Sequence, residues 1–218
     1  SGIGLLLSLI FLPDVSKEVN QIDKTSPRPW MTVIRDSTVA VLFLFRYAYT
    51  ACIGIIWCFM PVYADTRYSL SASLIGVLVM LGVFVSGLLH LPMGYLADRL
   101  EKKVLILVGG GLSSVGMVMP FYADGFADLV IAVTLFGVGG GVSMPAVMGR
   151  AVQIGDEKKA MGTVMSILTV AHSLGMFTGS MIAGLAMDYY SLGISFPIGM
   201  VFMSLGTLVI LFMMKTRQ

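Results

Sequence analysis

Two ionisable side chains stand inside long apolar stretches of the sequence, where a charge is costly. Arg46 lies about nine residues into the stretch 37–63, and His172 lies near the middle of 160–189. Ionisable residues inside membrane-crossing segments commonly mark substrate or ion pathways. An arginine binds carboxylate and phosphate groups, and a histidine takes up or releases a proton near neutral pH. These two positions are therefore the first candidates for binding and proton transfer.

Polar and aromatic side chains accompany both residues, those near Arg46 at helical spacing. One interpretation is a stripe that faces a substrate cavity, with Arg46 pairing with an anionic substrate or with a carboxylate elsewhere. The other is an arginine that snorkels to the lipid headgroups. His172 is either a proton-coupling or substrate-binding group, or a neutral histidine that hydrogen-bonds between helices. The accompanying residues are Tyr49, Thr50, Trp57, Ser166, Thr169 and Ser173.

Enzyme chemistry is not expected. The apolar stretches hold no nucleophile–base pair and no metal-binding spacing of Cys or His. The glycine runs 109–111 and 139–141 do not lead into a Lys–Ser/Thr pair, so they are not phosphate-binding loops. Cys52 and Cys58 fall on different faces of a helix, which argues against a disulfide between them. We expect no cofactor, no metal and no nucleic-acid partner.

The composition places the chain in a lipid bilayer. Apolar residues make up 57% of the 218 residues and charged residues only 12%, against about 25% charged in a typical soluble domain. The mean hydropathy is +0.91. Six stretches have the length needed to cross a membrane, and short connections make consecutive ones antiparallel. The predicted fold is an all-α bundle of six transmembrane helices, over 37–63, 70–97, 104–122, 129–149, 160–189 and 194–214.

The basic residues predict the orientation of these helices. Basic residues favour the cytoplasmic side, and on one side of the predicted bundle only Arg67 is found. Tyrosines gather on that same side, as expected of an interfacial belt. We therefore expect an integral membrane protein, in the inner membrane of a bacterium, with its linker and C-terminus in the cytoplasm. The basic residues of the cytoplasmic side are Lys17, Lys24, Arg28, Arg35, Arg99, Lys102, Lys103, Arg150, Lys158, Lys159, Lys215 and Arg217.

The remaining segments are assigned by length and polarity. Residues 1–12 are apolar but too short to span, so we interpret them as the end of a preceding transmembrane helix. Residues 13–36 form a polar cytoplasmic linker that contains the helix-breaking run SPRPW, and 215–218 form a cytoplasmic tail. The bundle itself is 37–214.

Small residues recur at four-residue spacing in three of the predicted helices, which favours close helix packing in lipid. The expected packing seams include His90 as a structural residue. They consist of Gly82, Ser86, His90 and Gly94, of Gly137 and Gly141, and of Gly175, Gly179 and Ala183.

The connection after the second predicted helix carries the most specific motif. It reads GYLADRLEKK over 94–103 and resembles the signature loop of the major facilitator superfamily, in which Glu101 here replaces a glycine. The matching residues with an expected gating role are Gly94, Asp98, Arg99, Lys102 and Lys103.

The resemblance extends over nearly the whole chain. It implies the C-terminal six-helix half of a transporter, with the pattern nearest to the drug:proton antiporter branch. It also implies that the motif holds two halves together, although the alternative is a basic anchor loop. The first, second, fourth and fifth helices would line the central cavity, and the N-terminal six-helix half would be the partner.

Three functions follow from these observations. The first is secondary transport by alternating access, as proton-coupled efflux of small amphipathic compounds. The second is uptake or exchange of an organic anion, motivated by Arg46. The third is a membrane subunit for assembly or sensing that transports nothing.

Overall fold

A computed structural model of the protein describes residues 29–213. Six of its helices are long and apolar enough to cross a membrane, and the described part contains no strand. This confirms the predicted fold class. The predicted segment 1–12, residues 13–28 of the linker and the tail 215–218 lie outside the described residues. The six long helices are α3 (Ser37–Tyr68), α4 (Ala72–Arg99), α5 (Lys102–Val118), α6 (Phe126–Glu157), α7 (Met161–Tyr189) and α8 (Ser195–Met213).

Three short helices complete the described chain. Helix α2 (Pro29–Ile34) lies in the predicted linker and begins at a proline, a residue that is tolerated in a first helical turn. The linker therefore contains a helix that its helix-breaking run did not indicate. The 3₁₀ helices η2 (Met119–Tyr122) and η3 (Leu192–Ile194) follow α5 and precede α8.

Two of the long helices, α3 and α6, extend further than hydrophobicity predicts. Helix α3 continues five residues beyond the predicted end, and α6 continues to Glu157 through residues assigned to a connection. The prediction of these two ends was wrong because it followed apolar character, whereas helical hydrogen bonding persists where a helix leaves the hydrocarbon. Only Lys158, Lys159 and Ala160 separate α6 from α7, and Lys159 has a positive φ of 50°.

The start of α3 is fixed by Asp36. Its carboxylate accepts hydrogen bonds from the backbone N–H groups of Thr38 at 2.8 Å and Val39 at 3.3 Å, a typical N-cap. The same carboxylate forms an ion pair with Lys158, at 2.8 Å. Burial alone would raise the pKa of Asp36, but the hydrogen bonds from Lys158 and the two backbone amides outweigh it and lower the pKa. The start of α3 is thus tied to the turn between α6 and α7.

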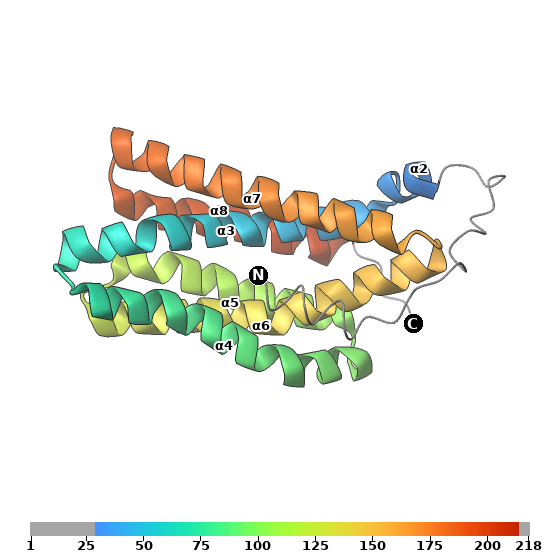
Figure 1. Ribbon diagram of the computed structural model, residues 1–218, viewed down its shortest axis with the longest axis horizontal. Helices are drawn as coiled ribbons and strands as arrows, with labels where there is room; N and C mark the ends of the chain where they lie inside the picture. The colour runs from blue at the N-terminus through green and yellow to red at the C-terminus, as the bar shows by residue number, and fades with distance from the viewer. Residues whose placement is uncertain (1–28, 214–218) are drawn as a thin grey trace, which may run out of the picture.

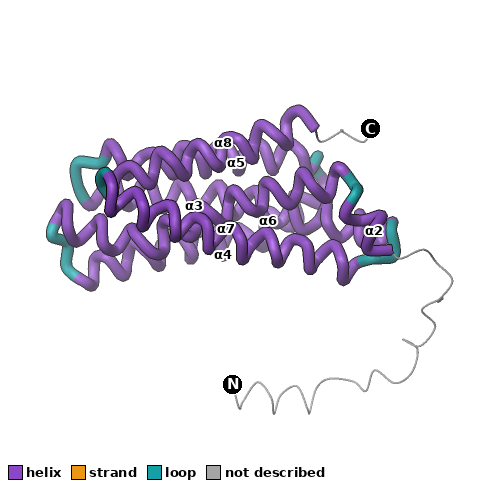
Figure 2. The backbone as a smooth tube through the Cα atoms, turned by 90° about the horizontal axis from the view of Figure 1, so that it is seen from above, coloured by secondary structure: helices purple, strands orange, loops and turns teal. Residues whose placement is uncertain are grey.

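The six helices lie in three layers of two. Helices α3 and α6 lie in the middle, α5 and α8 lie on one side of them, and α4 and α7 lie on the other (Figures 1 and 2). Helix α3 packs mainly on α7 and α8, and α6 packs mainly on α5 and α4. Consecutive helices α3 and α4 scarcely touch. The up-and-down order brings Arg99, Lys102, Arg150 and Lys158 to one end of the bundle, which we call the basic end.

Glycines form the closest helix contacts. A Cβ at Gly179 would collide with the backbone carbonyl of Ala51, so α3 and α7 approach to backbone contact. At Gly137 a Cβ would lie 2.5 Å from the carbonyl oxygen of Gly82, so α4 and α6 also approach to backbone contact. The expected seam does not continue to Gly94, where a Cβ would meet no described atom within 4 Å.

The side formed by α4 and α7 is open. Only Leu78 and Ala97 of α4 are buried. On α7, Ser166, Thr169 and Ser173 are all exposed along one stripe. We call this side, the outer faces of α4 and α7, the open flank.

Candidate functional site

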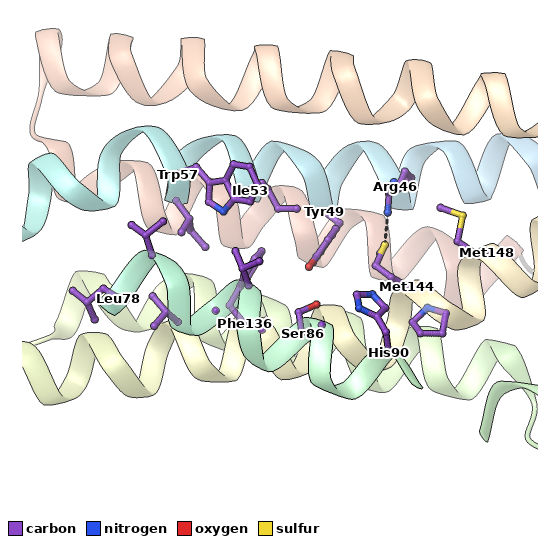
Figure 3. Close-up of a pocket in the computed structure, with 18 residues that line it drawn as sticks. Arg46, Tyr49, Ile53, Trp57, Leu78, Ser86, His90, Phe136, Met144 and Met148 are labelled. Carbon is purple, nitrogen blue, oxygen red and sulfur yellow. Dashed lines mark hydrogen bonds between the residues drawn. The ribbon is translucent and has the colours of Figure 1, made fainter. Parts of the chain in front are cut away.

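A cavity of about 590 Å³ opens between α3, α4 and α6. It occupies the space that the weak contact between α3 and α4 leaves, and side chains of α3 point across it toward α4 and α6 (Figure 3). Its lining is mainly apolar and includes Arg46, Tyr49, Ile53, Trp57, Leu78, Gly82, Ser86, His90, Val133, Phe136, Met144 and Met148.

Aromatic rings form the wall of the cavity. The rings of Tyr49 and Phe136 stack with centroids 5.3 Å apart and planes 6° apart. Tyr49 reaches α6 because Gly140 presents no side chain there, and a Cβ at that position would collide with the Tyr49 hydroxyl. The same hydroxyl faces that of Ser86 on α4 (Figure 3). Trp57 lies two turns further along α3 and is 47% exposed.

The end of the cavity nearer the basic end is polar. The guanidinium of Arg46 donates to the sulfur of Met144 over 2.7 Å. Its second terminal nitrogen lies 3.4 Å from Nδ1 of His172 on α7. Because a guanidinium has only donors, this contact requires His172 to accept through an unprotonated Nδ1. The Nε of Arg46 is buried and has no hydrogen-bond partner among the described residues.

Four helices contribute to this polar level. Arg46 lies nine residues from the basic end of α3, His90 nine from that of α4, His172 eleven from that of α7 and Met144 thirteen from that of α6. At about 1.5 Å per residue, these positions fall roughly 14–20 Å from the basic ends of their helices. The level therefore lies well inside the bundle.

The loop 94–103 lies at the basic end, away from the cavity. Helix α4 ends at Arg99 and α5 begins at Lys102, so each helix extends two residues further into this loop than predicted. The guanidinium of Arg99 sits 4.3 Å from the ring centroid of Tyr95. The N-cap position of α5 is Glu101, and Asp98 is exposed without a hydrogen-bond or ion-pair partner among the described residues.

The family model of the Major Facilitator Superfamily matches residues 42–218. The chain belongs to the major facilitator superfamily. Solved structures of similar fold include two of a peptide transporter, POT, carrying a point mutation, one in complex with alafosfalin and one with sulfate. Each shares 20% sequence identity and a TM-score of 0.73 and covers 85% of this chain.

The chain spans about two fifths of the length of these structures, 42% and 41%. Members of the major facilitator superfamily are transporters, so this membership is consistent with a transport function. The neighbours are peptide transporters and give no support to one branch of the superfamily over another.

The residues that the sequence predicted to face a substrate cavity fall into two groups. Arg46, Tyr49 and Trp57 line the cavity, and His172 contacts it through Arg46. The others lie elsewhere. Thr50 is buried against α7, where it donates to the Ala171 carbonyl at 3.3 Å. The exposed residues Ser166 and Thr169 donate to carbonyls of their own helix, and Ser173 is exposed on the same stripe.

Several lining residues were not expected to have this role. Ser86 and His90 were assigned to a packing seam, yet both line the cavity, and His90 is exposed. Phe136 carried no polar signal and is recognised only through its stacking on Tyr49. Met144 is recognised only through the hydrogen bond that its sulfur accepts from Arg46. The four-residue spacing of Ser86 and His90 was a usable signal, because it indicates one shared helix face.

Proposed function

We propose that this chain is the C-terminal half of a secondary transporter that exports small amphipathic compounds in exchange for protons, by alternating access. The observation that carries the proposal is the position of the cavity. It opens beside α4, the helix that its own chain covers least. A cavity with one wall missing is suited to a site completed by a second half.

The open flank supports a second half as partner. Apolar residues on α4 such as Met80, Leu88 and Leu91 are 66–85% exposed. The same flank carries Ser166, Thr169 and Ser173, hydroxyl groups that lipid tails do not favour. A polar stripe within a membrane span is expected to face protein or a water-filled space.

The lining supports an amphipathic substrate. The stacked rings of Tyr49 and Phe136 and the exposed ring of Trp57 offer apolar and aromatic surfaces, which accept many shapes. Arg46, Ser86 and His90 offer polar contacts toward the basic end. Ligand pockets typically combine a mainly apolar lining with a few placed polar groups.

Proton coupling is proposed from the two imidazoles. His90 and His172 stand at one level of the bundle, and an imidazole ring can take up and release a proton. Outward transport in exchange for protons rests on the sequence resemblance to the drug:proton antiporter branch. Uptake or exchange of an organic anion is the second candidate, because Arg46 has no acidic partner among the described residues.

The loop 94–103 is proposed as a contact between the two halves. Gly94 and Asp98 have no partner within the described chain, so both are available to another surface. With the basic end in the cytoplasm of a bacterium, this contact would close the cytoplasmic side of the transporter. A basic anchor loop is the alternative, and Gly94→Leu distinguishes them because only a contact between halves needs a small residue there.

The test begins with the intact mass of the natural protein. A mass near twice 23.4 kDa is expected for a transporter with two six-helix halves. That protein, reconstituted in liposomes, should then move a fluorescent amphipathic cation only when a pH gradient is imposed. A natural mass of 23.4 kDa without pH-driven transport would contradict the proposal and favour a subunit for assembly or sensing.

A further inference from the structure

We infer that Arg46 and His172 form the binding site for a single negatively charged group at the polar level of the cavity. The inference rests on the proposed function only in taking this bundle as half of a transporter. The charged group is a carboxylate or a similar oxyanion. It comes either from the substrate or from an acidic side chain of the other half, and the chemistry of recognition is the same.

The positive charge of Arg46 has no opposite charge beside it in the described chain. Its guanidinium is half-buried within the bundle and contacts a thioether and an imidazole, neither of which carries a negative charge. Both are neutral acceptors, and a thioether is a weak one. The Nε group is buried without any partner in the described chain. Three nitrogens of one cation therefore have little to balance them.

The acidic residues of the described bundle lie away from the level of Arg46. Every Asp and Glu of the described bundle lies at a helix end or in a connection. The ion pair found there, between Asp36 and Lys158, lies at the basic end, about nine residues of helix away from Arg46. Even a half-buried charge inside a bundle is unfavourable when no opposite charge lies near it. The balancing anion must accordingly come from outside the described chain.

The surroundings of Arg46 allow an anion to reach it. Arg46 is reached from the cavity, since it lines the wall together with His90 and Met144. Arginine presents paired donors that match the two oxygens of a carboxylate. His172 now accepts from Arg46, and its ring can instead donate to an oxyanion once the guanidinium turns to that anion. The pair offers donors from two helices, α3 and α7.

The rest of the cavity extends from Arg46 along α3. From Arg46 the aromatic wall runs through Tyr49 to Trp57, eleven residues further along α3. This corresponds to roughly 16 Å along the helix. A substrate with an aromatic body and one terminal carboxylate would place its charge at Arg46 and its ring against Tyr49 and Phe136.

The experiment compares two probes of equal shape. The natural full-length protein is purified in detergent, and the dissociation constants of 1-naphthaleneacetate and of the neutral 1-naphthaleneacetamide are measured. If the substrate supplies the anion, the carboxylate binds at least about ten-fold more tightly, in keeping with charge-assisted hydrogen bonds. Arg46→Gln removes this preference, and Arg46→Lys keeps part of it. Arg150→Gln is the matched control, because it removes a basic residue at the end of α6 and leaves the preference unchanged.

The melting temperature without ligand identifies the other source. If the other half supplies the anion, the protein shows no preference for the carboxylate. Arg46→Gln then lowers the melting temperature, because a buried carboxylate loses its partner. If the substrate supplies it, Arg46→Gln leaves the melting temperature unchanged or raises it. Absence of both the preference and the lowered melting temperature overturns the inference.

The inference and the proposed function fail in different assays. A preference for the carboxylate without pH-driven transport keeps the anion site and rejects proton-coupled export. Transport of an amphipathic cation that Arg46→Gln leaves intact, with equal binding of both probes and an unchanged melting temperature, keeps the transporter and rejects the anion site.

Discussion

Helices α3 and α4 follow one another in the chain and are both strongly apolar, yet their surroundings differ greatly. In an apolar stretch of 18 residues from each helix, 67% of α3 is buried within the bundle but only 6% of α4. Helix α3 packs closely on both α7 and α8, whereas α4 packs closely on α6 alone, through Gly82 and Gly137, and leaves most of its surface open. Apolar character alone therefore does not tell which membrane helix is central.

The difference teaches what holds this bundle together. Lipid tails are as apolar as leucine, so burial of apolar side chains gives little drive for helices to associate in a bilayer. Close approach of two helix backbones does favour association, because it increases van der Waals contact, and at these contacts it needs glycine. On α4, Gly82 meets α6 in this way, but at Gly76 and Gly94 a Cβ would meet no described atom within 4 Å. The contact between α3 and α7, which we call the closed seam, is made entirely within the described chain. The open flank has no partner there.

The largest expected effect is on the closed seam. Gly179→Val would place a branched side chain against the Ala51 backbone, which cannot move without separating α3 from α7. We expect a loss of about 3 kcal/mol in the free energy of unfolding, measured by equilibrium unfolding in mixed detergent. The matched control is Gly111→Val on α5, where a Cβ meets nothing within 4 Å. Equal losses in both variants would remove the contrast between seam and surface.

A smaller effect is expected where the seam begins. Asp36→Asn removes the ion pair to Lys158 and weakens the cap of α3, so we expect a loss of about 1 kcal/mol at neutral pH. Because the pKa of Asp36 is lowered in the folded protein, its contribution is fully present above the ordinary aspartate pKa of about 3.9 and is lost as pH falls through the lowered value.

The measurement for Asp36 is the melting temperature as a function of pH. The natural protein should approach the Asp36→Asn variant as the pH is lowered below about 4. Lys158→Met removes only the ion pair and should lie between the two at neutral pH. A constant difference between the natural protein and Asp36→Asn down to pH 2 would contradict this role.

The smallest effect on stability is expected at the open flank. Thr169→Val and Ser173→Ala change exposed side chains, and Thr169 donates only to its own helix. We expect changes in the free energy of unfolding within about 0.5 kcal/mol. If the stripe lines the transport path, the same variants change transport rates in liposomes. A large loss of stability would instead show that the stripe is a packing surface.

The sequence carried most of the fold, for identifiable reasons. Six apolar stretches predict six helices because the bilayer sets their minimum length. The small-residue seams that include Gly82, Gly137 and Gly179 predict surfaces of close helix packing, and helices meet at these three glycines. The ends of α3 and α6 could not be predicted from hydropathy, because helices continue into water wherever nothing interrupts their hydrogen bonding. Ser69 and Lys159, which have positive φ, follow the actual ends.

The candidate site was less predictable. Arg46, Tyr49 and Trp57 could be selected because they share a face at helical spacing, and all three line the cavity. The face of α7 could not be chosen in this way, since small and polar residues surround that helix. Which of its faces meets α3 was decided by Gly175 and Gly179, and this turned Ser166, Thr169 and Ser173 outward. The contact of His172 with Arg46 joins residues 126 positions apart and has no local signal.

The unequal lengths of the helices have a consequence for the membrane in which the protein works. Helices α3 and α6 each have 32 residues, whereas the outer helices α5 and α8 have 17 and 19. At about 1.5 Å per residue, the central pair is roughly 48 Å long and the outer pair about 26–29 Å, close to the thickness of a hydrocarbon core of about 30 Å. A bilayer that is thicker or thinner than this therefore differs in thickness from the length of α5 and α8. The ends of α3 and α6 extend beyond the acyl chains in either case. Lipid chain length thus acts on the side of the bundle opposite to the cavity.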